Sequence, residues 1–201
     1  MDDNVLVFSI LGVAFAAVGV HLYFYSRRLS RRIRNYAARH GLDYHAADRD
    51  NLETRLNETF DLPETGLVQN FGRIKDVVHF DGGVLFRTVE LLDLNPYASA
   101  SNPHNARAAV LFDCSGGPEG IFSISPTLEV RQRYPLEGED KTNKVAELFR
   151  GAGAERLPHP LSISLADGRA VAYLEPLVAG SMMETDLDYL IGLAGRLRRS
   201  G

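Results

Sequence analysis

The stretch with the clearest potential for chemistry is the run Asp113-Cys114-Ser115-Gly116-Gly117-Pro118. A serine in a Ser-Gly-Gly-Pro context could be a nucleophile, and the adjacent cysteine, the only one in the chain, could be a reactive thiol. A serine nucleophile needs a histidine as base and a carboxylate that orients this histidine. A reactive thiol needs a neighbouring cation or base that lowers its pKa. Both functions therefore depend on what the surrounding sequence supplies.

The surrounding sequence favours a turn. The run lies between two strand-like segments, residues 106–113 and 120–126, and its glycines and proline are the residues that tight turns require. Trypsin-like proteases have a glycine two residues before the nucleophilic serine, but this chain has Asp113 there. No histidine is next to Cys114 in the sequence. We therefore expect Ser115 to be a turn residue and Cys114 to be a half-buried, inert thiol.

A second polar stretch, residues 40–50, combines histidines and aspartates. Its members are His40, Asp43, His45, Asp48 and Asp50. They lack the spacing of a zinc pair on one helix face, and the glycine and distal glutamate of a calcium-binding EF-hand loop are missing. The chain also has no glycine-rich phosphate-binding loop motif. We expect this stretch to be a solvated connection, and we predict no catalytic residue, no metal site and no cofactor.

The N-terminal part of the chain is an apolar segment. Val5–Tyr25 has 21 residues and no Asp, Glu, Lys or Arg. As a helix it would be about 30 Å long, the thickness of a bilayer's hydrocarbon core. Its acidic start, its length and the arginines after it favour a retained anchor over a cleaved signal peptide. The sequence thus predicts a transmembrane helix within residues 1–26.

Six arginines follow directly within residues 27–39. Positively charged flanks stay in the cytosol, so we expect the N-terminus outside and the C-terminal domain inside. Leu29, Ile33, Tyr36 and Ala37 recur on one helical face, which predicts a basic juxtamembrane helix over residues 27–40. The residues expected to contact lipid headgroups are Arg27, Arg28, Arg31, Arg32 and Arg34.

Residues 41–201 are predicted to form a cytosolic α+β domain with a mostly antiparallel sheet and flanking helices. The strongest hairpin signals are Asp81-Gly82-Gly83 and Asp167-Gly168. Helical patterns lie near residues 48–62, 141–154 and 183–199, and a polar loop is expected at Asn95–Asn105. Residues 40–201 contain 24 acidic and 16 basic residues, so this domain would repel nucleic-acid phosphates.

The layout resembles a group of uncharacterised bacterial single-pass membrane-anchored proteins of about two hundred residues with a C-terminal α+β domain. Beyond the apolar N-terminal segment, the matching motifs are Ala38-x-x-Gly41-Leu42-x-Tyr44, Gly72-Arg73 through Val77 to Gly82, and Phe122-x-Ile124-x-Pro126. These motifs are structural. The resemblance implies a bacterial inner-membrane setting and transfers no catalytic residues.

These observations lead to one favoured function and two alternatives. We expect a membrane-tethered, non-catalytic interaction or accessory domain, such as a small subunit of a membrane complex. Its partners would be the bilayer and a membrane or cytosolic protein, and Gly12 and Ala16 leave a homo-oligomer open. One alternative is a membrane-bound, hydrolase-like enzyme whose site is assembled from distant residues. The other is a sensor of a small molecule or an anionic lipid.

Overall fold

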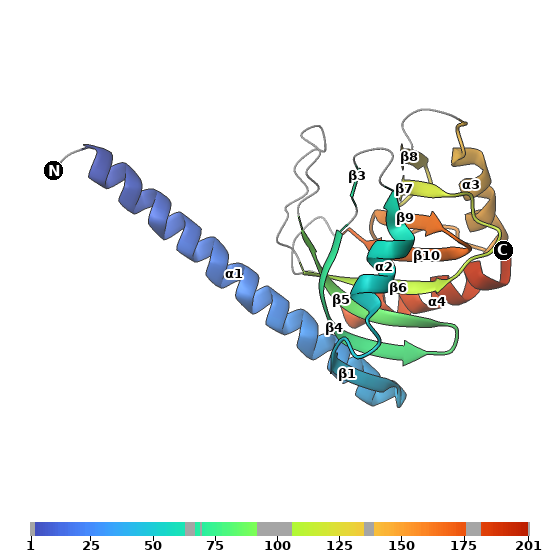
Figure 1. Ribbon diagram of the computed structural model, residues 1–201, viewed down its shortest axis with the longest axis horizontal. Helices are drawn as coiled ribbons and strands as arrows, with labels where there is room; N and C mark the ends of the chain where they lie inside the picture. Colours follow the sequence, from blue (N-terminus) through green and yellow to red (C-terminus); the bar gives the residue numbers. More distant parts are fainter. Residues whose placement is uncertain are drawn as a thin grey trace.

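The computed structural model describes residues 3–62, 67–68, 70–91, 106–134, 139–175 and 182–200. It contains one long N-terminal helix joined to a mixed domain of strands and helices (Figure 1). The polar loop expected at Asn95–Asn105 lies outside the described residues.

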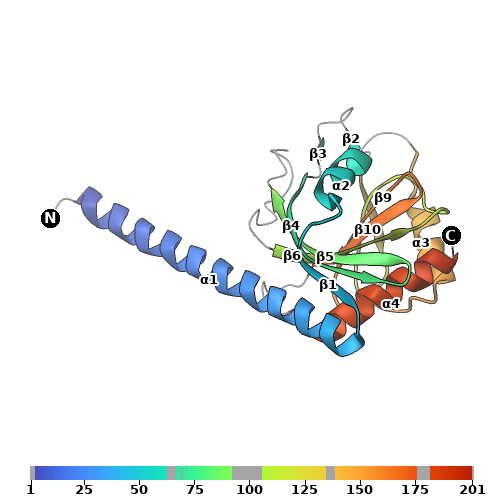
Figure 2. The same ribbon diagram turned by 60° about the horizontal axis from the view of Figure 1, so that its bottom comes forward.

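Helix α1 (Asp3–His40) is continuous over 38 residues. Its first part projects away from the domain, and its last turns lie against it (Figures 1 and 2). Large apolar side chains on the projecting part are more than half exposed, namely Phe8, Val13, Val20, Tyr23 and Phe24. Within the part of the chain that the structure describes, no helix meets the length and apolarity that a membrane crossing requires.

The domain is built on an eight-stranded sheet in which every described pairing is antiparallel. Its strand order is β1-β4-β5-β6-β10-β9-β7-β8. The strands are β1 (Asp43–Ala47), β4 (Asn70–Phe80), β5 (Gly83–Leu91), β6 (Ala106–Asp113), β7 (Gly120–Ile124), β8 (Val130–Tyr134), β9 (Leu161–Ala166) and β10 (Arg169–Leu174). Two short strands, β2 (Asp61–Leu62) and β3 (Leu67–Val68), pair separately.

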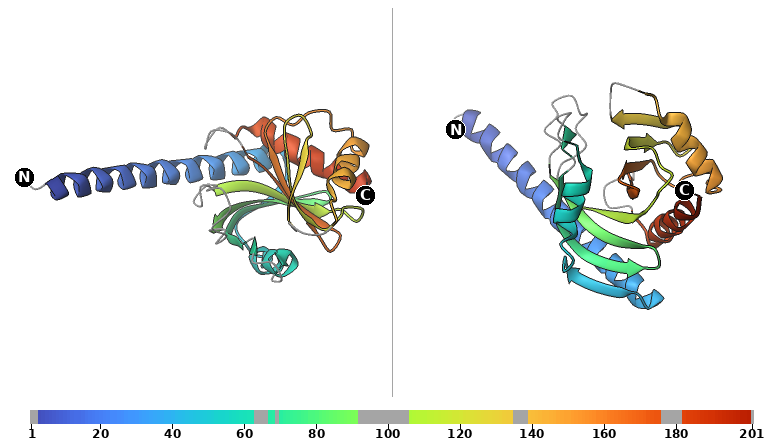
Figure 3. Two further views of the ribbon diagram at one scale, coloured as in Figure 1. Left: turned by 90° about the horizontal axis from the view of Figure 1, so that it is seen from above. Right: turned by 45° about the vertical axis from the view of Figure 1, so that its right-hand side comes forward.

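Helices cover both faces of this sheet. Helix α1 lies on one face together with α3 (Thr142–Gly151) and α4 (Glu184–Ser200), and α2 (Leu52–Phe60) lies on the other (Figure 3). Successive side chains along each strand point to opposite faces of the sheet, so a hydrophobic core forms on each face. On β9, for example, Leu161, Ile163 and Leu165 pack under α3 and α4, whereas the intervening serines point to the α2 side.

The predicted α+β class with a mostly antiparallel sheet is confirmed. Both hairpins form at the predicted turns, with Asp81-Gly82 between β4 and β5 and Asp167-Gly168 between β9 and β10. The prediction of a solvated connection over residues 40–50 is wrong in part, because Asp43–Ala47 pairs with β4 as strand β1. This strand is short and half-exposed, so its sequence has no continuous apolar pattern.

Asp48 caps helix α2. Its carboxylate accepts hydrogen bonds from the backbone N–H groups of Leu52 and Glu53, both at 2.9 Å. These N–H groups lie in the first turn and have no partner within the helix, so the cap satisfies two donors at once. Leu52, Leu56 and Phe60 are thereby held against the sheet.

We expect Asp48→Ala to lower the free energy of unfolding by about 1 kcal/mol, the usual value of such a cap. Asp50→Ala is the matched control, because Asp50 is exposed and its carboxylate pairs with His79 instead of the helix N–H groups. Urea unfolding of the full chain in detergent measures both variants. Equal losses in the two variants would contradict the capping role.

Candidate functional site

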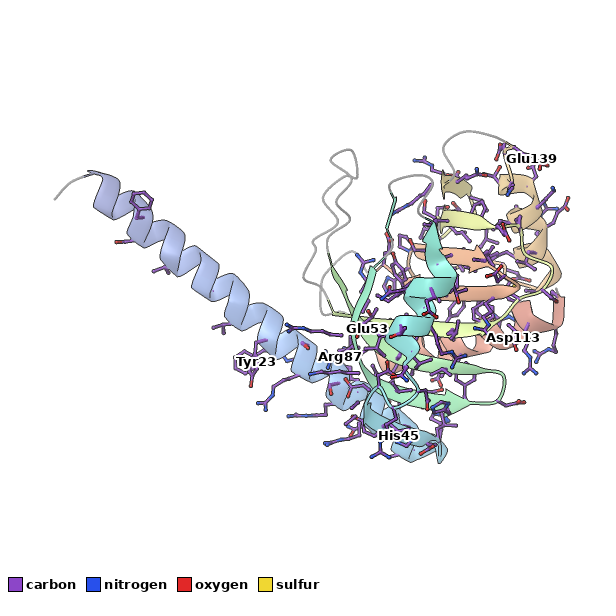
Figure 4. The ribbon with its side chains drawn as sticks, viewed as in Figure 1. Tyr23, His45, Glu53, Arg87, Asp113 and Glu139 are labelled. Carbon is purple, nitrogen blue, oxygen red and sulfur yellow. The ribbon has the colours of Figure 1, made fainter. Side chains whose placement is uncertain are left out.

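The junction between α1 and the sheet is organised by a buried ion pair. Arg87 Nε on β5 donates to Asp76 Oδ2 on β4 at 2.5 Å, and their side chains are only 10% and 4% exposed. Two α1 residues join this pair: Ser30 Oγ donates to Asp76 Oδ1 at 2.8 Å, and Arg87 Nη1 donates to Ser26 Oγ at 2.7 Å. Tyr44 OH on β1 donates to Asp76 Oδ1 at 2.7 Å. The α1 helix, β1 and β5 therefore all contact the carboxylate of Asp76. Figure 4 labels Arg87 at this junction.

An irregularity in β4 directs Asp76 towards α1. The register of β4 with β5 shifts on both sides of Lys75, and Asp76 has a positive φ of 53°. Aspartate tolerates this left-handed conformation better than most residues. As a consequence Ile74 and Val77, three positions apart, both pack in the α2 core, which a regular strand does not allow. Asp76 can then share the opposite face with Val78.

Apolar packing fixes α1 beside this pair. Leu29, Ile33, Tyr36 and Ala37 are at most 5% exposed and belong to the core that the sheet forms with α3 and α4. Their spacing places them on one side of the helix. The segment that the sequence suggested as a juxtamembrane helix is therefore also part of the domain's core.

Acidic residues of α4 face basic residues at the end of α1. Arg39 pairs with Glu184, and His40 Nε2 lies 3.8 Å from Asp188 Oδ1. Burial, together with the hydrogen bond and the charge of Asp188, raises the pKa of Tyr36 to about 12. The α4 acids thus hold the last turn of α1 in place.

The five arginines expected at lipid headgroups have different surroundings. Arg32 is half-buried and donates to the backbone carbonyl of Met182, so it contacts protein. Arg27 lies over the Tyr23 ring, 5.1 Å from its centroid. Arg28, Arg31 and Arg34 are exposed. Contact of these residues with lipid stays a prediction.

The Ser115 run is a turn, as predicted. Ser115 is exposed, and Cys114 N donates to Gly168 O at 2.7 Å, which ties the run to the neighbouring hairpin. Cys114 is 1% exposed, more buried than expected, and this burial raises the pKa of its thiol. A raised pKa disfavours the reactive thiolate.

The structure does bring together part of the histidine–aspartate stretch, along with one histidine from β4. His79 Nε2 lies 2.9 Å from Asp50 Oδ2, His45 Nε2 lies 3.1 Å from Asp43 Oδ2, and the two imidazole rings are 6.0 Å apart. Each histidine thus faces its own carboxylate. Among the described residues, no group of three or more His, Cys, Asp or Glu side chains could hold a metal ion.

Sequence reasoning missed the Asp76–Arg87 pair, although a signal was present. Both residues are charged, and they lie at equal distances from the Asp81-Gly82 turn. In a hairpin such positions face each other, so an acid and a base there indicate a cross-strand ion pair.

Comparisons with known proteins assign no family. No protein-family model matches the chain, and no curated protein matches it. Among solved structures, the chain is similar to the crystal structure of the mycobacterial trehalose monomycolate transport factor A, TtfA. The sequence identity is 15%, the TM-score is 0.46, and the match covers 87% of this chain and 94% of that chain. Similarity at this level assigns no function.

We expect Asp76→Ala to cost about 3–5 kcal/mol of unfolding free energy, because Arg87 would remain buried without its counter-charge. The double variant Asp76→Ala/Arg87→Met should recover most of this loss, since it removes both buried charges. Glu139→Ala is the control, because its ion pair with Lys144 is exposed. Chemical unfolding of the full chain in detergent measures all three variants. A loss for Asp76→Ala no larger than that for Glu139→Ala would show that the pair does not stabilise the junction.

Stability should fall as pH rises from about 10 to about 12. Burial, and then the hydrogen bond and charge of Asp76, raise the pKa of Tyr44 from 10.0 to about 12. The unfolded chain therefore loses this proton first, so the stabilisation is complete below pH 10 and is lost towards pH 12. Thermal unfolding at stepped pH should show a shallower decline for Tyr44→Phe than for the wild type. Identical slopes for Tyr44→Phe and the wild type would overturn this assignment.

Proposed function

We propose that the protein is a membrane-tethered, non-catalytic interaction or accessory domain. In this proposal residues 5–25 cross the bilayer, the N-terminus is outside and the domain is in the cytosol. One observation carries the proposal: α1 is a single helix, and Ser26, which directly follows the uncharged run that ends at Tyr25, already contacts Arg87 of the domain.

The projecting part of α1 supports a membrane environment for this segment. Phe8 and Val13 are 73% and 70% exposed, and Val20, Tyr23 and Phe24 are also more than half exposed. Exposure of large apolar side chains is unfavourable in water and is favourable in lipid. The sequence from Val5 to Tyr25 has 21 residues and no Asp, Glu, Lys or Arg, and a bilayer core of about 30 Å corresponds to roughly 20 helical residues.

The apolar segment is joined directly to the domain, which supports a role in holding one surface of the domain towards membrane partners. Leu29 and Ile33 are already in the domain core, so no flexible linker separates them from residue 25. A domain attached in this way would keep one orientation relative to the bilayer. The attachment would also raise its local concentration near membrane partners, which favours weak, specific contacts with them. Exposed Arg28, Arg31 and Arg34 would lie close to anionic headgroups.

The topology can be tested with two single-cysteine reporters in the full chain. Ser200→Cys should react with a membrane-impermeant maleimide only after cell lysis, and Asn4→Cys should react in intact cells. Cys114 is buried and should give little background. The wild type should also stay in the membrane pellet after alkaline carbonate washing, whereas deletion of residues 3–22 should release it.

The deletion retains Ser26, so the contact with Arg87 is preserved and loss of membrane binding can be attributed to the apolar segment. Labelling of Ser200→Cys in intact cells would reverse the proposed orientation. A deletion variant that stays in the carbonate-washed pellet would show that residues 5–25 are not the anchor.

A further inference from the structure

Strand β1 forms one edge of the eight-stranded sheet, beside the end of α1. It is the first strand in the sheet order and pairs with β4 on one side. Figure 1 shows it at the lower end of the sheet, next to the last turns of α1. Among the described residues, no backbone hydrogen bond reaches its other side. Such an edge carries a row of backbone N–H and C=O groups that can pair with an added strand.

Tyr44 holds this edge in place. Its OH donates to Asp76 Oδ1 at 2.7 Å, and its side chain packs against the core that contains α1. Because successive side chains of a strand alternate, Asp43 and His45 point to the opposite face. There Asp43 Oδ2 already faces His45 Nε2 at 3.1 Å. The two faces of the edge therefore differ, and the face of Tyr44 is the one that borders the arginines of α1.

Arg31 and Arg34 lie on the flank of α1 next to this edge. Ser30 contacts Asp76, and Arg34 follows Ser30 by four residues, which places both on one side of the helix. Burial raises the pKa of Tyr44 to about 12, and the charge of Arg34 opposes this rise, so its guanidinium is near the Tyr44 hydroxyl. Arg31 and Arg34 are exposed, and neither has an ion-pair partner among the described residues.

A second copy of this chain does not fit the edge in the proposed membrane arrangement. Two identical antiparallel edge strands are related by a two-fold axis perpendicular to the sheet. Helix α1 lies along one face of the sheet, where Leu29, Ile33 and Ala37 pack, so this axis would reverse its direction in the second copy (Figure 3). The two apolar segments would then project in opposite directions and could not enter one bilayer. This step rests on the proposed function, and it points to a different chain as the occupant.

We propose that β1 binds an extended, acidic segment of a partner protein as an additional strand. Main-chain hydrogen bonds would hold the segment along β1, and carboxylates on alternate residues would face Arg31 and Arg34. An arginine can hold a carboxylate with two parallel N–H donors, which adds specificity to the strand pairing. Arg34 lies about 13 Å along the helix from Tyr25, whereas a headgroup layer is about 5–8 Å thick, so a protein segment can reach it without competing with lipid.

The probe is the peptide acetyl-Thr-Glu-Val-Glu-Val-Glu-Thr-amide, titrated against the full chain in a nonionic detergent at low salt. We expect saturable binding, measured by the fluorescence anisotropy of a labelled peptide. Arg31→Glu/Arg34→Glu should weaken binding by more than about tenfold, because it places like charges opposite each other. The same variant should bind the peptide that has lysine in place of glutamate, which also shows that the variant is folded. Arg28→Glu/Arg150→Glu, the matched control, reverses two exposed charges elsewhere and should have little effect.

Hydrogen exchange separates strand addition from simple attraction of charges. The acidic peptide should slow amide exchange in residues 43–47 of the wild type. The same peptide methylated at every backbone nitrogen between its terminal threonines should neither bind nor slow exchange, because it lacks the N–H donors.

The proposal is overturned if the acidic peptide does not saturate, if the methylated peptide binds equally well, or if the control variant loses as much affinity as Arg31→Glu/Arg34→Glu. A disulfide between two copies of Ala46→Cys would also overturn it, because it would show a second copy at the edge. In phosphatidylcholine nanodiscs, loss of peptide binding on addition of phosphatidylglycerol would assign the two arginines to lipid and overturn the proposal as well. The detergent assay does not depend on whether α1 crosses a membrane, so its failure is distinguishable from a failure of the proposed topology.

Discussion

The position of the N-terminal helix depends on the ion pair between Asp76 and Arg87. Burial removes both charges from water, which costs several kcal/mol for each ion unless other groups compensate. Here the compensation comes from outside the hairpin, since Asp76 accepts from Ser30 and Tyr44 and Arg87 donates to Ser26. The pair is therefore satisfied only when α1 and β1 are in place. This requirement links the docking of α1 to the formation of the sheet.

The folded domain therefore does not begin where the composition of the sequence suggests. By charge and hydropathy, residues 27–40 look like a basic connector between an anchor and a domain. In the structure Leu29, Ile33 and Ala37 fill the core between the sheet and α4, so removal of this connector would open that core. In the proposed membrane arrangement, α1 is both the anchor and a structural element of the domain, and tilting of the span would move the domain with it.

Much of the fold follows from local sequence signals. The glycine turns at Gly82 and Gly168 predict both hairpins, and helical periodicity predicts α2, α3 and α4. The order of strands does not follow, because β10 inserts next to β6 through contacts between residues about sixty positions apart. The bulge that turns Asp76 towards α1 could not be predicted either, since one shift in register reverses which face each residue occupies. The approach of Arg133 to Glu175 depends on the curvature of the whole sheet, to which no single segment of sequence corresponds.

The Asp76–Arg87 pair also decides what each arginine of α1 contacts. With Ser26 and Ser30 held against the hairpin, the rotation of the helix about its axis is fixed. Arg32 then points to the carbonyl of Met182 and Arg39 to Glu184, so part of the basic charge is bound within the domain. Arg28, Arg31 and Arg34 remain on the exposed side, because steps of three residues follow one face of a helix. A count of arginines in the sequence treats these two sets alike. The buried pair separates them, because it turns Arg32 and Arg39 towards partners within the domain and leaves Arg28, Arg31 and Arg34 on the exposed side of the helix.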